Sequence, residues 1–171
     1  MSPAETPYQI IGEVAVAMIL GGLIGLEREM AHKPAGMRTH MLVAGMAALL
    51  VGLGSVMVLR FSDGISPTIM RFDPMGLIGA IISGVSFLCA GTIFRLESQQ
   101  RVEGLTTSAT LLMACALGIC VALREFLLAS IVTTMVLTVV WVVGRIERWL
   151  HRDCQEHTHK KTTSSDTTMN K

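Results

Sequence analysis

The chain has 171 residues, of which 51% are hydrophobic and 16% are charged, with a net charge of +1 and a mean hydropathy of +0.55. A soluble domain usually carries about a quarter charged residues, so this composition excludes an ordinary soluble domain. The small net charge gives no support for binding of nucleic acid. Only 5% of residues are aromatic, and aliphatic sequence rich in glycine is typical of packed membrane helices. We therefore expect an all-α membrane protein.

Five hydrophobic segments are close to the length of about 20 residues that spans a bilayer. Each of the first three is followed by a charged or turn-rich connection, and Arg124-Glu125 makes a tight turn between the last two. We expect about five transmembrane helices over 1–150 and a polar, disordered cytoplasmic tail over 151–171. The expected spans are 8–26, 40–59, 76–94, 105–123 and 126–144.

Lysine and arginine are unevenly distributed between the two sides of such a bundle. With the N-terminus outside, eleven of them fall on the inner side, and three fall on the outer side, namely Arg60, Arg71 and Arg124. Because positive residues favour cytoplasmic loops, we expect an outside N-terminus and a cytoplasmic C-terminus.

Small residues at one-turn spacing indicate close helix packing in the first and third spans. We expect these residues to build the bundle and to do no chemistry; they are Gly21, Gly22, Gly25, Gly84 and Gly91. Cys89, Cys115 and Cys120 lie in apolar spans and are expected to pack as small apolar side chains. Cys154, with His157 and His159, has incomplete metal-ligand spacing, so we expect no metal site.

Charge is concentrated where the first span ends and the second begins, in Glu27, Arg28, Glu29, Arg38 and His40. We call this group the charged collar. It fits either a solvated rim or a paired network at the cytoplasmic mouth of the bundle, and charge is expensive at such depth. In the second case we expect Arg38 to pair with Glu27 or Glu29.

Two acidic residues lie near the opposite side of the membrane. Asp73 precedes Pro74 at a helix start, which fits either a helix cap or an extracytoplasmic carboxylate that meets a cation. Glu13 lies about one turn inside the first span, so we expect it to face the bundle, reach the outer surface or be protonated. No Walker loop, His-Glu-x-x-His or nucleophile elbow is present, so we expect no enzyme activity and no cofactor.

Together these motifs resemble the MgtC/SapB membrane proteins of bacteria. The resemblance runs in order through about the first 125 residues, and the segments that carry it are 22–29, 35–40, Asp73-Pro74, 83–91 (SGVSFLCAG) and 102–109 (VEGLTTSA). The last segment places Gly104, Thr106 and Thr107 at a loop and helix start.

The chain also departs from the family pattern at four positions of the third span. Ser86 and Cys89 replace usual glycines, Gly76 replaces an arginine and Ala80 a glutamine. These changes put in doubt a polar pathway or ion site built from the family's arginine and glutamine.

The resemblance implies a multi-pass protein of the bacterial inner membrane, linked to adaptation to low magnesium, acid stress or survival inside a host. We expect a regulator that contacts the lipid bilayer, other copies of itself or another membrane complex such as the ATP synthase. The alternative is a small oligomeric transporter or channel for Mg²⁺ or another small ion. Ser, Thr and Gly residues in the middle spans favour that alternative, and the absence of a mid-membrane acidic residue opposes it.

Overall fold

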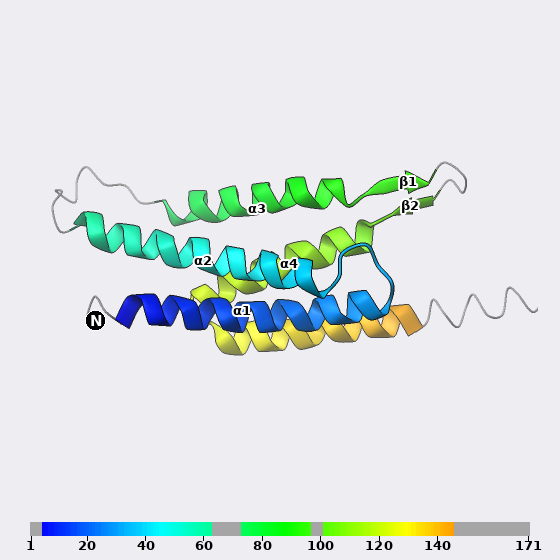
Figure 1. Ribbon diagram of the computed structural model, residues 1–171, viewed down its shortest axis with the longest axis horizontal. Coiled ribbons are helices and arrows are strands. Elements are labelled where there is room, and N and C mark those ends of the chain that lie inside the picture. Colours follow the sequence, from blue (N-terminus) through cyan, green and yellow to red (C-terminus); the bar gives the residue numbers. More distant parts are fainter. Residues whose placement is uncertain (1–4, 63–72, 97–100, 146–171) are drawn as a thin grey trace, which may run out of the picture. The chain divides into compact units, whose positions relative to one another are not determined.

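The computed structural model describes residues 5–62, 73–96 and 101–145, and Figure 1 shows their elements. The labelled elements are α1 (Glu5–Met30), α2 (Met37–Ser62), α3 (Pro74–Gly91), β1 (Phe94–Leu96), β2 (Arg101–Glu103) and α4 (Leu105–Ala122). A fifth helix over Phe126–Arg145 follows α4. The tail predicted over 151–171, with Cys154, His157 and His159, lies outside the described residues.

All five described helices are long and apolar enough to cross a membrane, which confirms the five predicted spans. Apolar residues surround each helix instead of forming a single stripe, as expected where one side faces protein and the other faces lipid. The boundaries differ at the charged collar, because α1 continues through Glu27 and Arg28 to Met30. Glutamate and arginine are good helix formers, so the helix does not stop where the apolar segment does.

The chain divides into two compact units, residues 1–136 and 137–171, and the division falls within the fifth helix. In the second unit, the Arg145 guanidinium lies 5.4 Å from the centre of the Trp141 ring. Aromatic and basic residues are common at the ends of membrane helices. The predicted domain boundary at residue 150 lies outside the described residues.

Helices α1, α2 and α4 form the closely packed core of the first unit, with glycines where they meet. A methyl group on Gly25 would lie 2.6 Å from the Cα of Met37, and one on Gly21 would lie 2.7 Å from the carbonyl oxygen of His40. Gly118 of α4 approaches the backbone of α2 as closely. Small residues at such positions allow helix backbones to approach each other, so these glycines set the spacing of the core.

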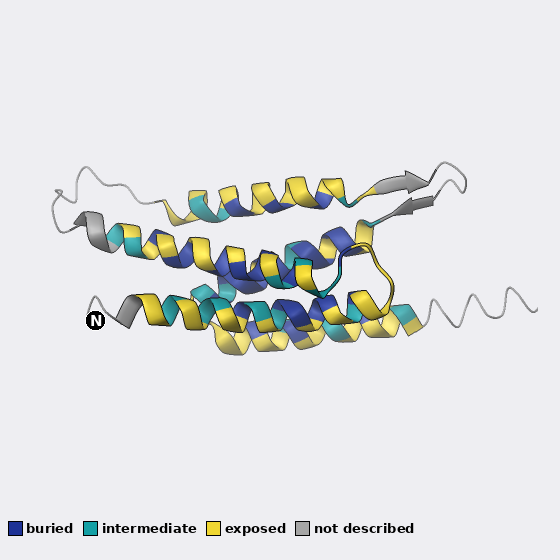
Figure 2. Cartoon of the chain, in the orientation of Figure 1, coloured by how far each residue is buried: buried dark blue, intermediate teal, exposed yellow. Residues whose placement is uncertain are grey.

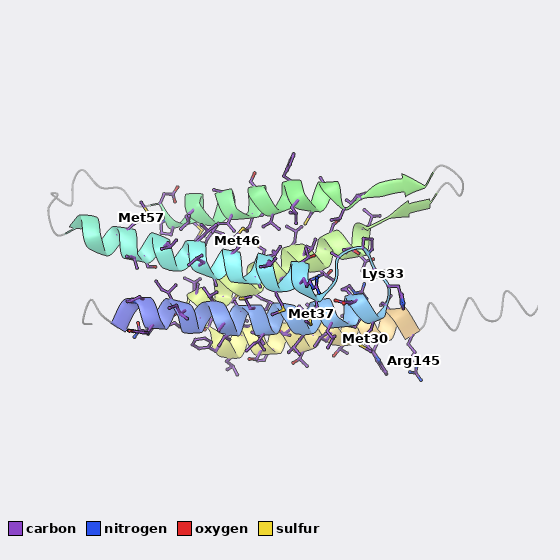
Figure 3. The ribbon with its side chains drawn as sticks, viewed as in Figure 1. Met30, Lys33, Met37, Met46, Met57 and Arg145 are labelled. Atoms are coloured by element: carbon purple, nitrogen blue, oxygen red, sulfur yellow. The ribbon has the colours of Figure 1, made fainter. Side chains whose placement is uncertain are left out.

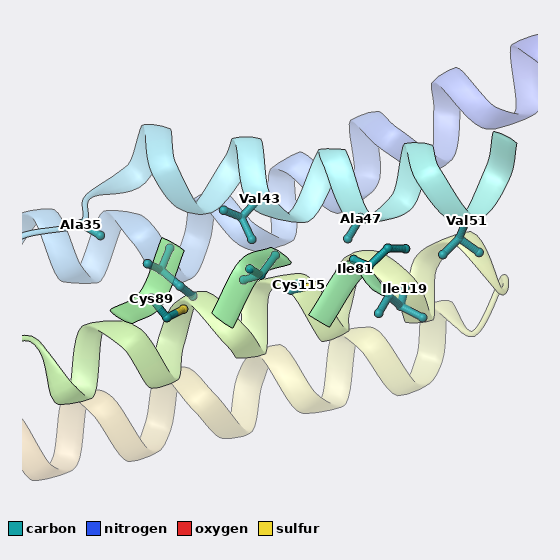
Figure 4. Close-up of a cluster of buried hydrophobic side chains, with 10 residues drawn as sticks. Ala35, Val43, Ala47, Val51, Ile81, Cys89, Cys115 and Ile119 are labelled. Carbon is teal, nitrogen blue, oxygen red and sulfur yellow. The ribbon is translucent and has the colours of Figure 1, made fainter. Parts of the chain in front are cut away.

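Helix α3 packs on this core through one narrow stripe. Its buried residues are Ile81, Val85 and Cys89, which join a hydrophobic cluster with residues of α2 and α4 (Figure 4). Most of the remaining surface of α3 is exposed (Figure 2). Gly84 and Gly91 lie on that exposed side, where a methyl group would meet nothing within 4 Å. The prediction that these two glycines pack inside the bundle is wrong for the described chain, because they lie off the buried stripe.

A short antiparallel hairpin of β1 and β2 joins α3 to α4, where the sequence indicated only a connection. Phe94 pairs with Glu103, and Leu96 pairs with Arg101. Gly104 follows at the N-cap of α4 with a φ of 94°, a left-handed conformation that glycine adopts without steric cost. Gly104 also lies against the backbone of Thr92 with no room for a side chain. Glycine therefore permits the turn from the hairpin into α4.

Candidate functional site

Buried polar side chains gather at the end of the first unit where α1 ends and α2 and α4 begin. We call this region the polar end; Lys33 and Met37 mark it in Figure 3. Six polar or charged residues are buried in the described chain, and all except Thr133 belong to this region: Arg28, His40, Thr107, Ser108 and Thr110. Buried polar groups are costly unless they are paired, so their partners define the site.

Arg28 is the buried cation of the polar end. Its side chain is 4% exposed, and its Nε donates a hydrogen bond to Glu27 Oε2 at 2.6 Å. The Glu27 side chain is 22% exposed, so the pair lies at the edge of the protein. Loss of one partner would leave a largely buried charge, which costs more than loss of a surface ion pair. This pair is the part of the predicted collar network that is present in the structure.

Glu29 caps the first turn of α2 from across the loop. Its Oε2 accepts a hydrogen bond from the backbone N–H of Met37 at 2.9 Å. The first turn of α2 contains no acidic residue of its own, so Glu29 supplies the negative charge that stabilises a helix N-terminus. A methyl group on Gly36 would lie 2.8 Å from the same carboxylate oxygen. The glycine thus leaves space for the cap.

Arg38 does not take the role that the sequence suggested. Its side chain is exposed, and it forms no ion pair within the described residues. Glu27 is already paired with Arg28, and Glu29 is engaged by Met37. The predicted pairing of Arg38 with one of these acids is therefore wrong.

His40 lies inside the helix core and not on the rim. Its side chain has no exposed surface, and its Nδ1–H donates a hydrogen bond to the carbonyl oxygen of Gly36 at 2.9 Å. Its Nε2 lies 3.0 Å from the hydroxyl of Thr110 on α4, so His40 links α2 to α4. The positive charge of Arg28 acts on the ring. A signal for this burial was available, because Ala44, Ala47 and Val51 continue the inner face of α2 from His40.

A second polar group joins the C-terminal end of α3 to the start of α4. Ser108 Oγ lies 3.0 Å from the carbonyl oxygen of Cys89 and 2.9 Å from the hydroxyl of Thr92. The Cys89 thiol donates to the carbonyl oxygen of Ser108 at 3.4 Å. Ser108, Thr92 and Thr110 were not recognised from the sequence as site residues. Of the two threonines predicted in this segment, Thr107 is buried and Thr106 is exposed.

The departures from the family pattern fall on both sides of α3. Cys89 lies in the buried stripe, whereas Gly76, Ala80 and Ser86 are exposed. The Ser86 hydroxyl donates to the carbonyl oxygen of Ile82 at 2.8 Å. The serine is therefore satisfied within its own helix and does not point a free donor at α4.

Asp73 lies at the opposite end of α3 from the hairpin. It occupies the N-cap position before Pro74, but its side chain makes no capping hydrogen bond. The carboxylate lies over Gly76, where a methyl group would come within 2.6 Å of Asp73 Oδ2. The side chain is exposed. No group of three or more His, Cys, Asp or Glu side chains in the described residues could hold a metal ion.

Glu13 faces a cation from the turn between α4 and the fifth helix. Arg124 Nε donates to Glu13 Oε1 at 3.2 Å, and Arg124 Nη2 donates to Gln9 Oε1 at 2.8 Å. Arg124 adopts a positive φ of 64°, and its side chain is 50% exposed, against 11% for Glu13. Of the three situations considered for Glu13, the structure places it against the bundle with an ion-pair partner.

Comparison with known proteins gives a consistent result. The model of the MgtC family matches residues 14–149. The chain is 34% identical over 151 residues to an uncharacterised protein of Haemophilus influenzae, covering 88% of this chain and 62% of that protein. It is 34% identical over 139 residues to the putative magnesium transporter YhiD of Escherichia coli K12, covering 77% and 60%. It is 37% identical over 126 residues to the protein MgtC of Brucella abortus, covering 74% and 48%.

The chain therefore spans about three fifths of the length of the first two of these relatives and about half of the third. No solved structure matches it.

Proposed function

The chain belongs to the MgtC family, and from this premise we propose that it is a non-enzymatic regulator that acts on other membrane proteins by direct contact. The proposal places its role in adaptation to low magnesium, with acid or host stress as related conditions. A relative in Escherichia coli carries the name of a putative magnesium transporter, which supports the link to magnesium. The main support for a contact-based mechanism comes from the exposed side of α3.

The exposed side of α3 has the composition of a helix-packing surface. With about 3.6 residues per turn, the residues opposite the Ile81–Val85–Cys89 stripe are Gly76, Ala80, Ser83, Phe87 and Ala90, all of which are exposed. Gly79, Gly84 and Gly91 flank them. Apart from Phe87, which is 86% exposed, this side carries only small residues. Small residues gather at helix–helix contacts in membranes, because they let backbones approach.

Other helices of the chain present a different surface outward. The exposed residues of α1 and α2 include Ile11 at 65%, Ile19 at 61% and Leu42 at 65%. Large aliphatic side chains of this kind suit contact with lipid tails. The contrast supports the view that the outer side of α3 meets another membrane helix, supplied by a second copy of the chain or by another complex.

Orientation forms part of the same proposal. The excess of Lys and Arg on the side of the polar end supports a cytoplasmic polar end and C-terminus in the bacterial inner membrane, because positive loops remain inside. A reporter that is active only outside the cytoplasm, fused after Arg152, should be silent. Activity of that fusion would reverse the orientation.

The transport alternative would require an acidic residue that is available to a cation within the membrane-spanning helices. A coupled cation transporter usually places an acidic residue in its pathway. Glu13 is the acid that lies deepest in the described spans, and it is held by Arg124, which supports regulation over transport. Mg²⁺ flux into liposomes that contain the purified chain would favour the alternative.

The test of the regulator compares two glycines that both face open space. Gly84 on α3 and Gly12 on α1 each have nothing within 4 Å of an added methyl group, so leucine at either position should leave the fold intact. We expect Gly84→Leu to abolish cross-linking to membrane partners and growth at low magnesium in a strain that lacks its own copy. Gly12→Leu should retain both. Equal behaviour of the two variants would contradict the proposal.

A further inference from the structure

The hydroxyl of Thr110 faces two acceptors with one hydrogen. It lies 2.9 Å from the carbonyl oxygen of Thr107, the usual bond of a threonine to its own helix, and 3.0 Å from Nε2 of His40. On the other side of the ring, Nδ1 must carry a hydrogen, because its partner is the carbonyl oxygen of Gly36. A neutral His40 therefore has a bare Nε2 and needs the hydrogen of Thr110.

Two complete hydrogen-bonding arrangements follow from this geometry. With His40 neutral, Thr110 donates to Nε2. With a proton added to Nε2, that nitrogen becomes the donor, and the Thr110 hydroxyl turns to the carbonyl oxygen of Thr107. Both arrangements use the same heavy-atom positions, so the direction of the bond between α2 and α4 reports the charge of His40.

The surroundings decide between the two arrangements. On α1, Arg28 acts on the ring with its positive charge. The two acids at this end of α1 are both engaged, Glu27 by Arg28 and Glu29 by the backbone N–H of Met37. The segment 105–114 of α4 and the whole of α3 contain no acidic or basic residue. The ring has no exposed surface and lies near the starts of α2 and α4, where helix dipoles are positive.

We infer that His40 and Thr110 form a proton-sensitive lock between α2 and α4, closed while His40 is neutral. A proton on Nε2 adds a second positive charge beside Arg28 in a buried site, and this loosens the start of α4 from α2. The unfolded chain takes up that proton more readily than the folded chain, so stability falls as the pH falls. The lock is internal to the first unit and goes beyond the proposed contacts of α3.

The first test reads the ring directly in the intact chain. Of the five histidines, the four others can be replaced together by glutamine: His32, His151, His157 and His159. Nitrogen NMR of the remaining His40 at pH 7.5 should show a protonated Nδ1 and a bare Nε2. A signal from the opposite tautomer, or from the doubly protonated ring, would overturn the inference.

The second test measures stability on either side of the ordinary histidine pKa of about 6.5. We expect the unfolding midpoint in detergent to fall by at least about 2 °C between pH 7.5 and pH 5.5. The fall should persist in His32→Gln, which changes an exposed loop histidine, and disappear in His40→Gln. Persistence in both variants would contradict the lock.

Thr110 provides a check that does not alter the histidine. Thr110→Ser keeps the hydroxyl and should keep the neutral-pH midpoint of the parent chain. Thr110→Val keeps the shape but leaves Nε2 without a donor, so it should be less stable than the serine variant at pH 7.5. The difference should not close at pH 5.5, because a protonated Nε2 would then lack its acceptor. A valine variant as stable as the serine variant at pH 7.5 would exclude Thr110 as the donor.

Discussion

The α1–α2–α4 core and helix α3 use the same small residues in different ways. In the core, an added methyl group at Gly25 would come within 2.6 Å of Met37 Cα, and Gly118 lies against the backbone of Ala44. On α3, the same addition at Gly84 or Gly91 would meet nothing within 4 Å. Small residues recur at one-turn spacing in both regions, as Gly21–Gly25 on α1 and Ala80–Gly84 on α3, but the glycines face different surroundings.

The difference separates two kinds of contribution. Core glycines set the distance between helices, so they should affect the stability of the isolated chain. Those on α3 shape a surface, so they should affect association and leave the isolated chain stable. The distribution of charge agrees with this division, because both described ion pairs involve α1 and none involves α3. Glu27–Arg28 lies within α1, and Glu13–Arg124 joins α1 to the turn after α4.

The largest loss of stability is expected from filling the space at a core glycine. Gly25→Leu inserts four heavy atoms where the backbone of α2 already lies in contact. Overpacking costs roughly 1–3 kcal/mol or more, and here we expect at least about 3 kcal/mol, measured as the free energy of unfolding in detergent. Gly12→Leu, in open space on α1, is the matched control. A Gly25→Leu chain as stable as that control would mean that α1 and α2 do not meet as described.

The second largest loss of stability is expected at the Glu27–Arg28 pair. Glu27→Gln leaves the Arg28 guanidinium buried without its carboxylate. Loss of one partner of a fully buried pair costs about 3–5 kcal/mol, and because Glu27 is 22% exposed we expect about 2 kcal/mol. The double variant with Arg28→Gln should lose less than the sum of the two single changes. Additive losses in that double-mutant cycle would show that the pair is not coupled.

The spans were predictable because length and apolar composition suffice to define a membrane helix. The same reasoning located the glycines of α1, since their spacing coincides with a packing face. It could not decide which side of α3 is buried, because that helix is apolar all round and its sequence carries no polar side to mark the outside. Gly84 and Gly91 were misplaced for this reason.

The candidate site was predictable as a region and not in its pairings. The residue pattern placed charge at the junction of α1 and α2, but the partner of each side chain depends on helical phase. Arg28 points into the core, whereas Arg38, two positions before the buried His40, points out. Contacts with α4 were missed altogether, because Thr110 is distant from His40 in the sequence.

The Arg124–Glu13 contact should have a smaller effect on the core. Arg124 is 50% exposed, and exposed ion pairs contribute about 0–1 kcal/mol because solvent and salt screen them. We expect Arg124→Gln to cost about 1 kcal/mol, since Glu13 is only 11% exposed and loses its partner. Glu13→Gln added to that variant should recover part of the loss. No recovery would indicate that Arg124 acts through its hydrogen bond to Gln9 and not through its pair with Glu13.

The smallest effect on stability is expected at Arg38, which forms no described ion pair. Arg38→Ala should change the free energy of unfolding by less than about 0.5 kcal/mol, as is usual for surface positions. Arg28→Ala should cost far more, which makes it the matched control for the loss of an arginine at the same end of the bundle. A double variant of Arg38 and Glu29 should show no coupling.

If Arg38→Ala nevertheless impairs growth at low magnesium, the loss would come from a contact outside the chain. The polar end would then be a second docking region beside the α3 surface. Measurable coupling between Arg38 and Glu29 would instead restore the collar network that the sequence suggested.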